Sequence, residues 1–555
     1  MGDERAVAQA ELVAERSLSL DEYWAAAEAR LDWPLTRGLN LAHECCDRWA
    51  DDRGRMAISV HEPDGSVTRW TFYELMRASR AMANALTAAG LQRGDRFAAL
   101  LDQQIESYIC ALAAWRAGIV YVPLFVGFGI DALVQRLESA EVSAVVVDYR
   151  HRATYSKVQA GLTSDPNVFT VAGPRGVGVQ TGDASLWEQI LQASPHYETV
   201  ATEPSECATL IFTSGTTGKP KGCMHPHSAI LPLQSFLRHT AALSADDVVF
   251  AGASPGWSYG LYAAGLGVQS LGVSRAIYTG PFDAAAWLRV MNKERTTFVF
   301  AAPSAYRPLA AAAARDALPD STRGGISAGE PLTSALVEAW AAVGGGVLQD
   351  GYGSSEMGMV LANLAHDDRA VPAGALSSPV PGFDVVLVDE NGQEQPDEGI
   401  IGVRGARWPI IGYKDLDDLW QAKTVNGVFL SGDLARRDAE GYYWFAGRSD
   451  DVIVTAGYNV GPTEVENIIA GIAGVNDVAV VAAPDKARGS VVRAVVVDDG
   501  SIDHVSLTGH IQKIVKEQLG RHAYPKIVDY VDALPRTEVG KVRRNVLRET
   551  GPRVE

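Results

Sequence analysis

The sequence has no apolar run of the roughly 20 residues that a helix needs to span a bilayer. Its first residues, MGDERAVAQAELVAERS, alternate acidic and small side chains and lack the basic and then apolar pattern of a signal peptide. It also lacks low-complexity tracts and internal repeats. We therefore expect a globular protein without a membrane span, located in the cytoplasm.

Cysteine is scarce, and the number and spacing of the cysteines indicate a reducing compartment. The five are Cys45, Cys46, Cys110, Cys207 and Cys223. An odd number without metal-ligand spacing indicates reduced thiols, as in a cytoplasm. A cysteine nucleophile is conceivable, but for each of them we predict a buried, small apolar side chain.

Basic residues are fewer than acidic ones: the chain has 49 Lys and Arg and 67 Asp and Glu, which gives a net charge of −18. This balance argues against a nucleic-acid partner and against binding to anionic lipid headgroups. It leaves room for a local cationic pocket that holds a phosphorylated ligand.

Short apolar runs alternate with amphipathic stretches, such as residues 77–91, along most of the chain. Runs such as AVVVD and TFVFAA are apolar on both faces, as in a covered parallel sheet, so they predict an α/β fold. The predicted strands are 97–101, 143–149, 247–253 and 297–303. The pattern changes near Gly447, after a hairpin-like section with a turn at Glu440 and Gly441. We predict a large α/β unit at residues 1–447, a polar break at 448–450, and a small α+β unit at 451–555.

The sharpest motif, TSGTTGKPKG, follows the apolar run 208–212 directly. Glycines and small hydroxylated residues let the backbone approach an anion, while amides, hydroxyls and ammonium groups complement its charge, so a triphosphate is the natural guest. The spacing differs from the GxxxxGK[ST] pattern of P-loop kinases. The alternative is a flexible surface loop. The candidate residues are Thr213, Ser214, Gly215, Thr216, Thr217, Gly218, Lys219 and Lys221.

A second motif, QDGYGSSE, also ends a strand-like run. Glu356 beside the Ser355 hydroxyl can hold Mg²⁺ against phosphate oxygens. Tyr352, between two glycines, is expected to offer an exposed ring for stacking on a base. By itself the motif is explained equally well by a plain turn.

Two shorter segments are ambiguous in isolation. Asp433 in SGD can accept both hydroxyls of a ribose, with Arg448 fifteen residues later, but it can also be a turn or helix-capping residue. Lys541 follows a glycine near the C-terminus, where a solvated basic face is the alternative.

Taken together, TSGTTGKPKG, GYGSSE, SGD, GRSDD and the last GK resemble the adenylate-forming superfamily, in this order and spacing. That superfamily contains acyl-CoA synthetases, luciferases and the adenylation domains of peptide synthetases, and the resemblance runs from about Leu41 to Arg548. It implies a large domain of stacked α/β subdomains, a hinge at Asp450 and a small, mobile domain. It also implies an AMP-forming acid–thiol ligase that uses ATP, Mg²⁺ and coenzyme A.

The resemblance implies a role for each nucleotide-site residue. The TSGTTGKPKG loop would wrap the β- and γ-phosphates, Ser355 would touch the α-phosphate, and Glu356 would ligate Mg²⁺. Asp433 would hold the ribose, with Arg448 beside it. The residues that would contact the adenine are Gly329, Glu330, Pro331, Asp350, Gly351 and Tyr352.

Lys541 would be the catalytic lysine of adenylate formation, because a cation aimed at the α-phosphate stabilises the charge that develops there. Gly457 would line the tunnel for the pantetheine thiol. Two alternatives stay open: an adenylating enzyme that loads a separate carrier protein, and a non-catalytic nucleotide-binding homologue. No carrier-domain serine motif follows Lys541, which favours a free thiol. The oligomeric state is also open, a homodimer included.

The amino-acid sequences of several segments are most similar to those of acetyl-, medium-chain- and benzoate-type CoA ligases. Acetate enzymes carry a tryptophan at the position of Gly353, so its absence suggests an acid larger than acetate. The candidates are short branched, medium-chain or simple aromatic acids, with 2-hydroxyisobutyrate among them because Ser258, Tyr259 and Ser354 are polar. Trp257 and Tyr259 are expected to wall the acyl pocket, a buried core position being the alternative. Contact with the acid or capping of a turn explains His225 equally well.

Overall fold

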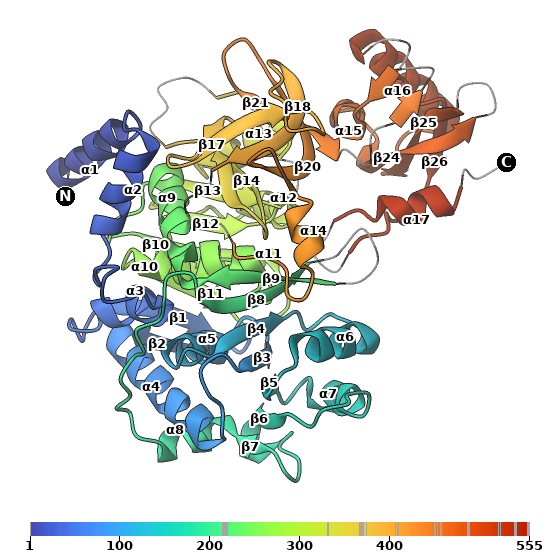
Figure 1. Cartoon of the computed structure of the whole chain (residues 1–555). Helices are drawn as coiled ribbons and strands as arrows, with labels where there is room; N and C mark the ends of the chain where they lie inside the picture. Colours follow the sequence, from blue (N-terminus) through green and yellow to red (C-terminus); the bar gives the residue numbers. More distant parts are fainter. Residues whose placement is uncertain are drawn as a thin grey trace.

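The computed structural model describes residues 2–213, 220–329, 332–365, 371–372, 374–405, 407, 410–448, 451, 453–455, 458–485, 489–519, 521, 523–537 and 541–551. Figure 1 shows a large N-terminal part and a smaller C-terminal part that lies beside it. Both mix helices and strands, so the predicted α/β fold with a small second unit is confirmed.

A seven-stranded sheet has the order β7-β6-β5-β3-β4-β8-β9. Neighbouring strands are parallel except β8 and β9, which are antiparallel. Every residue of β4 and β5 is buried, which is why these runs are apolar on both faces. The bounds are β3 (Arg96–Leu100), β4 (Val120–Leu124), β5 (Ala144–Asp148), β6 (Asn167–Val171), β7 (Ala184–Ser185), β8 (Cys207–Thr213) and β9 (Lys221–Pro226).

A nine-stranded sheet has the order β16-β15-β14-β13-β12-β10-β11-β1-β2. It is parallel from β14 to β1, and β15, β16 and β2 run antiparallel at its two edges. The bounds are β1 (Met56–His61), β2 (Val67–Thr71), β10 (Val248–Ala251), β11 (Ser274–Tyr278), β12 (Phe298–Ala301), β13 (Gly324–Ala328), β14 (Val347–Ser354), β15 (Gly358–Ala362) and β16 (Ser378–Pro379).

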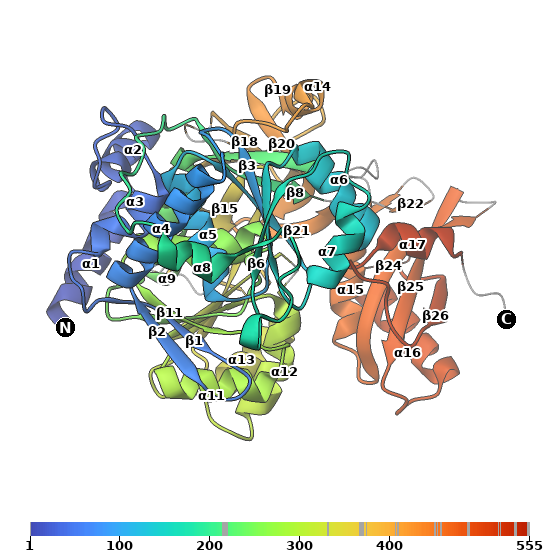
Figure 2. The ribbon, with the colours of Figure 1, turned by 90° about the horizontal axis from the view of Figure 1, so that it is seen from below.

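Helices cover both sheets, and some lie between them. All twelve residues of α5 are buried, and one hydrophobic cluster joins α4, α5 and α9 to strands of both sheets, so these helices form a shared inner layer (Figure 2). The helices of the large part are α1 (Gly2–Glu15), α2 (Leu20–Ala29), α3 (Leu41–Cys45), α4 (Phe72–Ala88), α5 (Ile105–Arg116), α6 (Ile130–Ala140), α7 (Arg152–Gln159), α8 (Leu186–Gln192), α9 (Ile230–Ala241), α10 (Gly267–Ser270), α11 (Ala284–Glu294), α12 (Pro303–Ala313), α13 (Ser334–Ala342) and α14 (Asp417–Gln421).

A third sheet of the large part carries the predicted hairpin. Its strands are β17 (Asp384–Val388), β18 (Glu398–Arg404), β19 (Thr424–Val425), β20 (Val428–Arg437) and β21 (Tyr443–Arg448). β20 and β21 pair antiparallel, and their turn includes Glu440 and Gly441 as predicted.

The small part has its own core, in which α15 and α16 pack on a three-stranded sheet. Its elements are β22 (Ile453–Thr455), β23 (Tyr458–Val460), α15 (Pro462–Ala470), β24 (Val475–Asp485), β25 (Gly489–Asp498), α16 (His504–Leu519), β26 (Ile527–Tyr530) and α17 (Arg544–Glu549). The predicted boundary at 448–450 falls between the end of β21 and the start of β22; residues 449–450 lie outside the described residues.

Four of the five cysteines agree with the expectation that each side chain is buried. All five thiols are free, and four of them are fully buried, with Cys207 half-buried. Burial raises the pKa of Cys207 to about 12, so this thiol is a poor nucleophile at neutral pH. Within the described residues, no helix is long and apolar enough to cross a membrane.

Candidate active site

Two hydrogen-bonded strands frame the predicted phosphate loop. β8 ends at Thr213 and β9 begins at Lys221, its register partner. Lys221 is buried, and its ammonium nitrogen lies 5.6 Å from the centre of the Tyr413 ring. The other predicted loop residues lie outside the described residues, namely Ser214, Gly215, Thr216, Thr217, Gly218 and Lys219.

The segment that contains Tyr413 is hydrogen-bonded to the open edge of β9. The Met224 amide donates to the Gly412 carbonyl (2.9 Å), and the Lys414 amide donates to the Gly222 carbonyl (2.8 Å). These bonds on either side of Tyr413 fix its backbone, and its ring is fully buried. Tyr413 is thereby held at the strand that follows the phosphate loop.

Glu356 lies between β14 and β15 and has two hydrogen-bond partners. The Tyr413 hydroxyl donates to Oε1 (2.8 Å), and the amide of Glu356 donates to Ser354 Oγ (3.2 Å). Burial by itself would raise the pKa of Glu356, but hydrogen bonds from Tyr413 and Ser354 and the charge of Lys423 hold that pKa below its usual range. The carboxylate is therefore charged at neutral pH and offers the oxygen donors that Mg²⁺ prefers.

Ser355, next to Glu356, is half-buried, and its hydroxyl makes no hydrogen bond with any residue that the structure describes. In the same part of the chain, no cluster of three or more His, Cys, Asp or Glu side chains could hold a metal. A Mg²⁺ ion at Glu356 would therefore take its other ligands from substrate phosphates and water, as Mg²⁺ commonly does in nucleotide enzymes.

The strands β14, β20 and β21 bring together Tyr352, Asp433 and Arg448. The Tyr352 hydroxyl donates to Asp433 Oδ2 (2.7 Å), and Arg448 Nη1 lies 3.3 Å from Asp433 Oδ1. Asp433 and Arg448 are register partners, which confirms that SGD and the arginine are neighbours. The expectation of an exposed Tyr352 ring is wrong, because the side chain is only 9% exposed and packs against Phe445 at 6.2 Å.

Lys541 comes from the small part of the chain, and its side chain is exposed. Burial raises the pKa of Asp433, and the positive charges of Arg448 and Lys541 oppose that rise. The backbone of Lys541 is held by Thr537, whose hydroxyl accepts its amide (3.1 Å). The predicted hinge and tunnel residues, Asp450 and Gly457, lie outside the described residues.

The predicted adenine-contacting residues stand at the ends of two adjacent parallel strands. β13 ends next to Gly329, which has a φ of +92°, and β14 carries Asp350 and Gly351 beside it. A Cβ at Gly351 would lie 2.7 Å from Met359 Cε and 3.0 Å from Phe236 Cζ, so a side chain at this position would require both neighbours to shift. Burial raises the pKa of Asp350 to about 7. Glu330 and Pro331 lie outside the described residues.

An aromatic cluster lies at the end of β4, where an acyl pocket is expected. The Trp257 ring is 5.3 Å from that of Phe125 and 5.4 Å from that of Phe128. Trp257 is only half-buried, so part of this apolar surface remains accessible to a ligand. The cluster supplies a large and rigid contact area for an apolar group.

Tyr259 is half-buried like Trp257, whereas His225 is buried. The Tyr259 hydroxyl donates to the Ile326 carbonyl (3.0 Å), which leaves it without a free proton to offer an acid. His225 is buried and stacks on Tyr262 with ring centres 5.5 Å apart. Its Nε2 has no partner among the described residues, and burial lowers its pKa to about 4, so the ring is neutral.

The backbone around Gly353 gives this glycine an explanation besides the predicted room for a larger acid, which stays a prediction. A Cβ at this position would lie 1.9 Å from the Gly358 carbonyl oxygen and 2.8 Å from Met359 Cα. The register of β14 and β15 shifts beside it, at Tyr352. Glycine is therefore required by the close approach of two backbones, whatever acid the site accepts.

Sequence reasoning missed Tyr413 and Lys423. Neither belongs to a motif, and both reach the site through segment 410–423, which pairs with β9 and with β20. The available signal was a group of lysines and aromatic residues between Tyr413 and Phe429. These residues do not follow the spacing of any of the motifs above.

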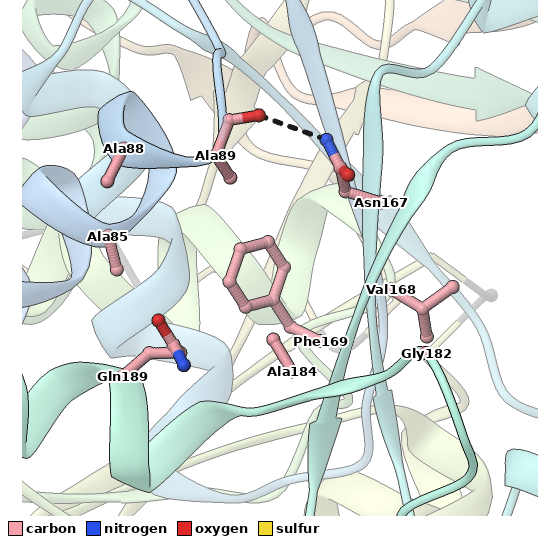
Figure 3. A pocket seen from close by; sticks show the side chains of 9 residues that line it. All are labelled: Ala85, Ala88, Ala89, Asn167, Val168, Phe169, Gly182, Ala184 and Gln189. Carbon is pink, nitrogen blue, oxygen red and sulfur yellow. Dashed lines mark hydrogen bonds between the residues drawn. The ribbon is translucent and has the colours of Figure 1, made fainter.

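A cavity of about 180 Å³ lies elsewhere, among α4, β6, β7 and α8 (Figure 3). Its lining has no charged side chain, and Asn167 donates to the Ala89 carbonyl (3.1 Å). Such a lining does not suit a nucleotide, so this cavity is separate from the site above. The lining residues are Ala85, Ala88, Ala89, Asn167, Val168, Phe169, Gly182, Ala184 and Gln189.

Two family descriptions match the chain. Residues 46–413 match "AMP-binding enzyme", which covers more than half of the sequence, and residues 464–541 match "AMP-binding enzyme C-terminal domain". The chain belongs to the AMP-binding enzyme family. This membership confirms the predicted resemblance to adenylate-forming enzymes.

Individual relatives of this AMP-binding enzyme agree with the family match. The rat acyl-coenzyme A synthetase ACSM4, mitochondrial, is 30% identical over 550 residues, with 96% of this chain and 93% of the relative covered. Among solved structures, a Brucella canis acyl-CoA synthetase is 32% identical, with a TM-score of 0.76 over 97% of this chain and 98% of its own. A benzoate CoA ligase from Burkholderia xenovorans LB400 is 26% identical, with a TM-score of 0.81 over 92% of this chain and 99% of its own. The predicted enzyme class, an AMP-forming acid–CoA ligase, is confirmed.

Proposed function

We propose that this AMP-binding enzyme uses ATP and Mg²⁺ to join a carboxylic acid larger than acetate to the thiol of coenzyme A. The acid is first converted to an enzyme-bound acyl-adenylate. The observation that carries the proposal is the group formed by Tyr352, Asp433 and Arg448, in a chain that matches both the AMP-binding enzyme family and its C-terminal domain.

In the first half-reaction, the acid carboxylate attacks the α-phosphorus of ATP and pyrophosphate leaves. A carboxylate is already a nucleophile, so the site needs positive charge rather than a general base. Lys221 supplies such charge at the phosphate loop, and Lys541 supplies it where the ribose carboxylate Asp433 positions the nucleotide. Mg²⁺ at Glu356 would neutralise phosphate charge when bound.

In the second half-reaction, the thiol attacks the acyl carbonyl and AMP leaves. The Lys541 loop would then have to withdraw, because the ammonium would occupy the side from which the thiol approaches. The resemblance to adenylate-forming enzymes implies that a pivot at Asp450 and a tunnel past Gly457 would provide for this step. A thiol on a separate carrier protein is the alternative to coenzyme A.

The acyl side favours an apolar acid over a hydroxylated one. Trp257 offers accessible aromatic surface, whereas two of the three hydroxyls considered for an acid's own hydroxyl are engaged: Tyr259 with Ile326 and Ser354 with Glu356. We therefore place medium-chain and simple aromatic acids, the latter being the type named for the benzoate CoA ligase, ahead of short branched acids and 2-hydroxyisobutyrate.

The test is pyrophosphate release with acetate, isobutyrate, 2-hydroxyisobutyrate, hexanoate and benzoate, with and without coenzyme A. We expect kcat/KM for hexanoate or benzoate to exceed that for acetate by about tenfold or more, since each methylene contributes about 1–3 kcal/mol in an apolar pocket. Acetate as the best substrate would contradict the proposed acid class. Adenylate formation without thioester in the presence of coenzyme A would favour the carrier-protein alternative.

A further inference from the structure

Lys423 is a half-buried lysine at the phosphate end of the site that none of the motifs includes. Its ammonium nitrogen lies 5.7 Å from the centre of the Phe429 ring. The ammonium group makes no hydrogen bond and no ion pair with any residue in the described part of the chain. An ammonium that is partly removed from water without a partner destabilises the fold, so a purely structural role does not explain it.

The backbone of Lys423 is fixed on both sides. Its amide donates to the Trp420 carbonyl (3.0 Å), and its carbonyl accepts the amide of Leu430 in β20 (2.8 Å). The side chain therefore starts from a rigid strand end that is three residues from Asp433 along the paired strand β20. This anchoring limits the space in which the ammonium can move.

Three aromatic rings link Lys423 to Lys221. Trp420 lies between Tyr413 and Phe429, with ring centres 5.2 Å and 5.1 Å away. Lys221 lies over the first of these outer rings and Lys423 over the second. The two ammonium groups thus contact the two outer members of one aromatic cluster, in which Tyr413 meets Trp420 edge to face.

The electrostatic surroundings agree with this placement. Burial lowers the pKa of Lys423; the carboxylate of Glu356 opposes that effect, while the charge of Lys221 adds to it. Lys423 in turn helps to keep Glu356 ionised.

We propose that Lys423 is a further binding residue for the triphosphate of ATP and for its product pyrophosphate. The inference rests on the ligase reaction proposed above. A triphosphate carries several negative charges, so a second cation on the aromatic cluster that Lys221 contacts would add to its binding, while Glu356 would hold the metal. Arginine at this position would keep the charge, whereas methionine would keep the length and the apolar stem without it.

The test compares Lys423→Met and Lys423→Arg with the wild type, using MgATP and pyrophosphate as the probes. Deleting a charged partner of a phosphate is expected to raise the Kd of MgATP, titrated without any acid, by about 10- to 100-fold. The KM of pyrophosphate in ATP synthesis from the acyl-adenylate should rise to a similar extent, while the KM of the acid stays within about twofold. Lys423→Arg should retain MgATP binding within about threefold.

Lys414→Met is the matched control, because Lys414 lies in the same segment but its ammonium is paired with Asp415 (2.5 Å) and Glu141 (3.0 Å). It should bind MgATP like the wild type. Unchanged MgATP and pyrophosphate affinities in a folded Lys423→Met would overturn the proposal, and so would an arginine variant as weak as the methionine variant. If Lys423→Met lowers the thermal unfolding midpoint, Lys423→Gln replaces it with the same expectations. Because the titration uses no acid, its outcome does not depend on the acid class proposed above.

Discussion

The phosphate end and the acyl end of this site are built from different kinds of contact. At the phosphate end, Glu356 and Asp433 each have a tyrosine hydroxyl at 2.7–2.8 Å and a cation nearby. At the acyl end, the contacts are mostly between aromatic rings. Trp257 contacts two phenylalanines, and the hydroxyl of Tyr259 donates to a backbone carbonyl. Directional contacts at fixed distances tolerate few substitutions, whereas an aromatic wall can change gradually. We therefore expect changes at the phosphate end to stop the reaction and changes at the acyl end to alter the choice of acid.

The largest expected effect is that of Lys541→Ala. Removing a cation that faces the developing charge should lower the rate of adenylate formation by about 10²- to 10³-fold, as for other single electrostatic groups. Thioester formation from a supplied acyl-adenylate should remain, because that step does not involve the α-phosphate attack. Single-turnover assays of each half-reaction make the comparison. Equal loss of both half-reactions in a folded variant would show that Lys541 is not specific to the first.

Tyr413→Phe sharpens the comparison at the phosphate end. The hydroxyl that donates to Glu356 holds the pKa of that carboxylate down, so its removal should raise the pKa. Because the ionised carboxylate is the required form, the acidic limb of the pH–activity profile should move to higher pH. Loss of a hydrogen bond to a charged group should lower kcat/KM for MgATP by about 10- to 100-fold. A profile with an unmoved acidic limb would mean that Glu356 does not control it.

Gly353→Ala tests whether the backbone, rather than the acid, requires this glycine. The Cβ would lie 1.9 Å from the Gly358 carbonyl, and we expect the free energy of unfolding to fall by about 1–3 kcal/mol. Gly54→Ala is the control, because its Cβ would meet only Asp52 Oδ1 at 3.5 Å, an ordinary contact. Urea unfolding measures both. A Gly353→Ala variant as stable as Gly54→Ala, with a changed acid preference, would restore the pocket interpretation.

The smallest effect is expected at the acyl end. Trp257→Leu keeps an apolar side chain but loses the contacts with Phe125 and Phe128, each aromatic pair being worth about 0.5–1.5 kcal/mol. We expect kcat/KM for hexanoate and benzoate to fall by about 2- to 10-fold, with the KM of MgATP unchanged. A rise in the KM of MgATP as large as the fall in kcat/KM for the acids would contradict the expectation that changes at the acyl end affect only the choice of acid.

The strands could be predicted from local patterns of the sequence. The place of Arg448 beside Asp433 was implied instead by the resemblance to adenylate-forming enzymes, and the register of β20 and β21 agrees with it. The sequence did not reveal Tyr413 or Lys423, since their places depend on hydrogen bonds between distant segments and not on spacing. It misled at Tyr352, because a tyrosine between glycines does not show that its hydroxyl will be drawn to Asp433. At Gly353 a glycine pattern does not say whether a ligand or another backbone needs the space.

The segment that seats Tyr413 also covers a sheet edge. β9 is the last strand of its sheet, and an uncovered edge strand presents unpaired amides and carbonyls to which another chain can add. Hydrogen bonds from Gly412, Lys414 and their neighbours occupy those groups. Loosening this one segment would thus remove the partner of Glu356 and create a surface prone to intermolecular strand pairing. Inactivation and aggregation would then arise together from a single local opening.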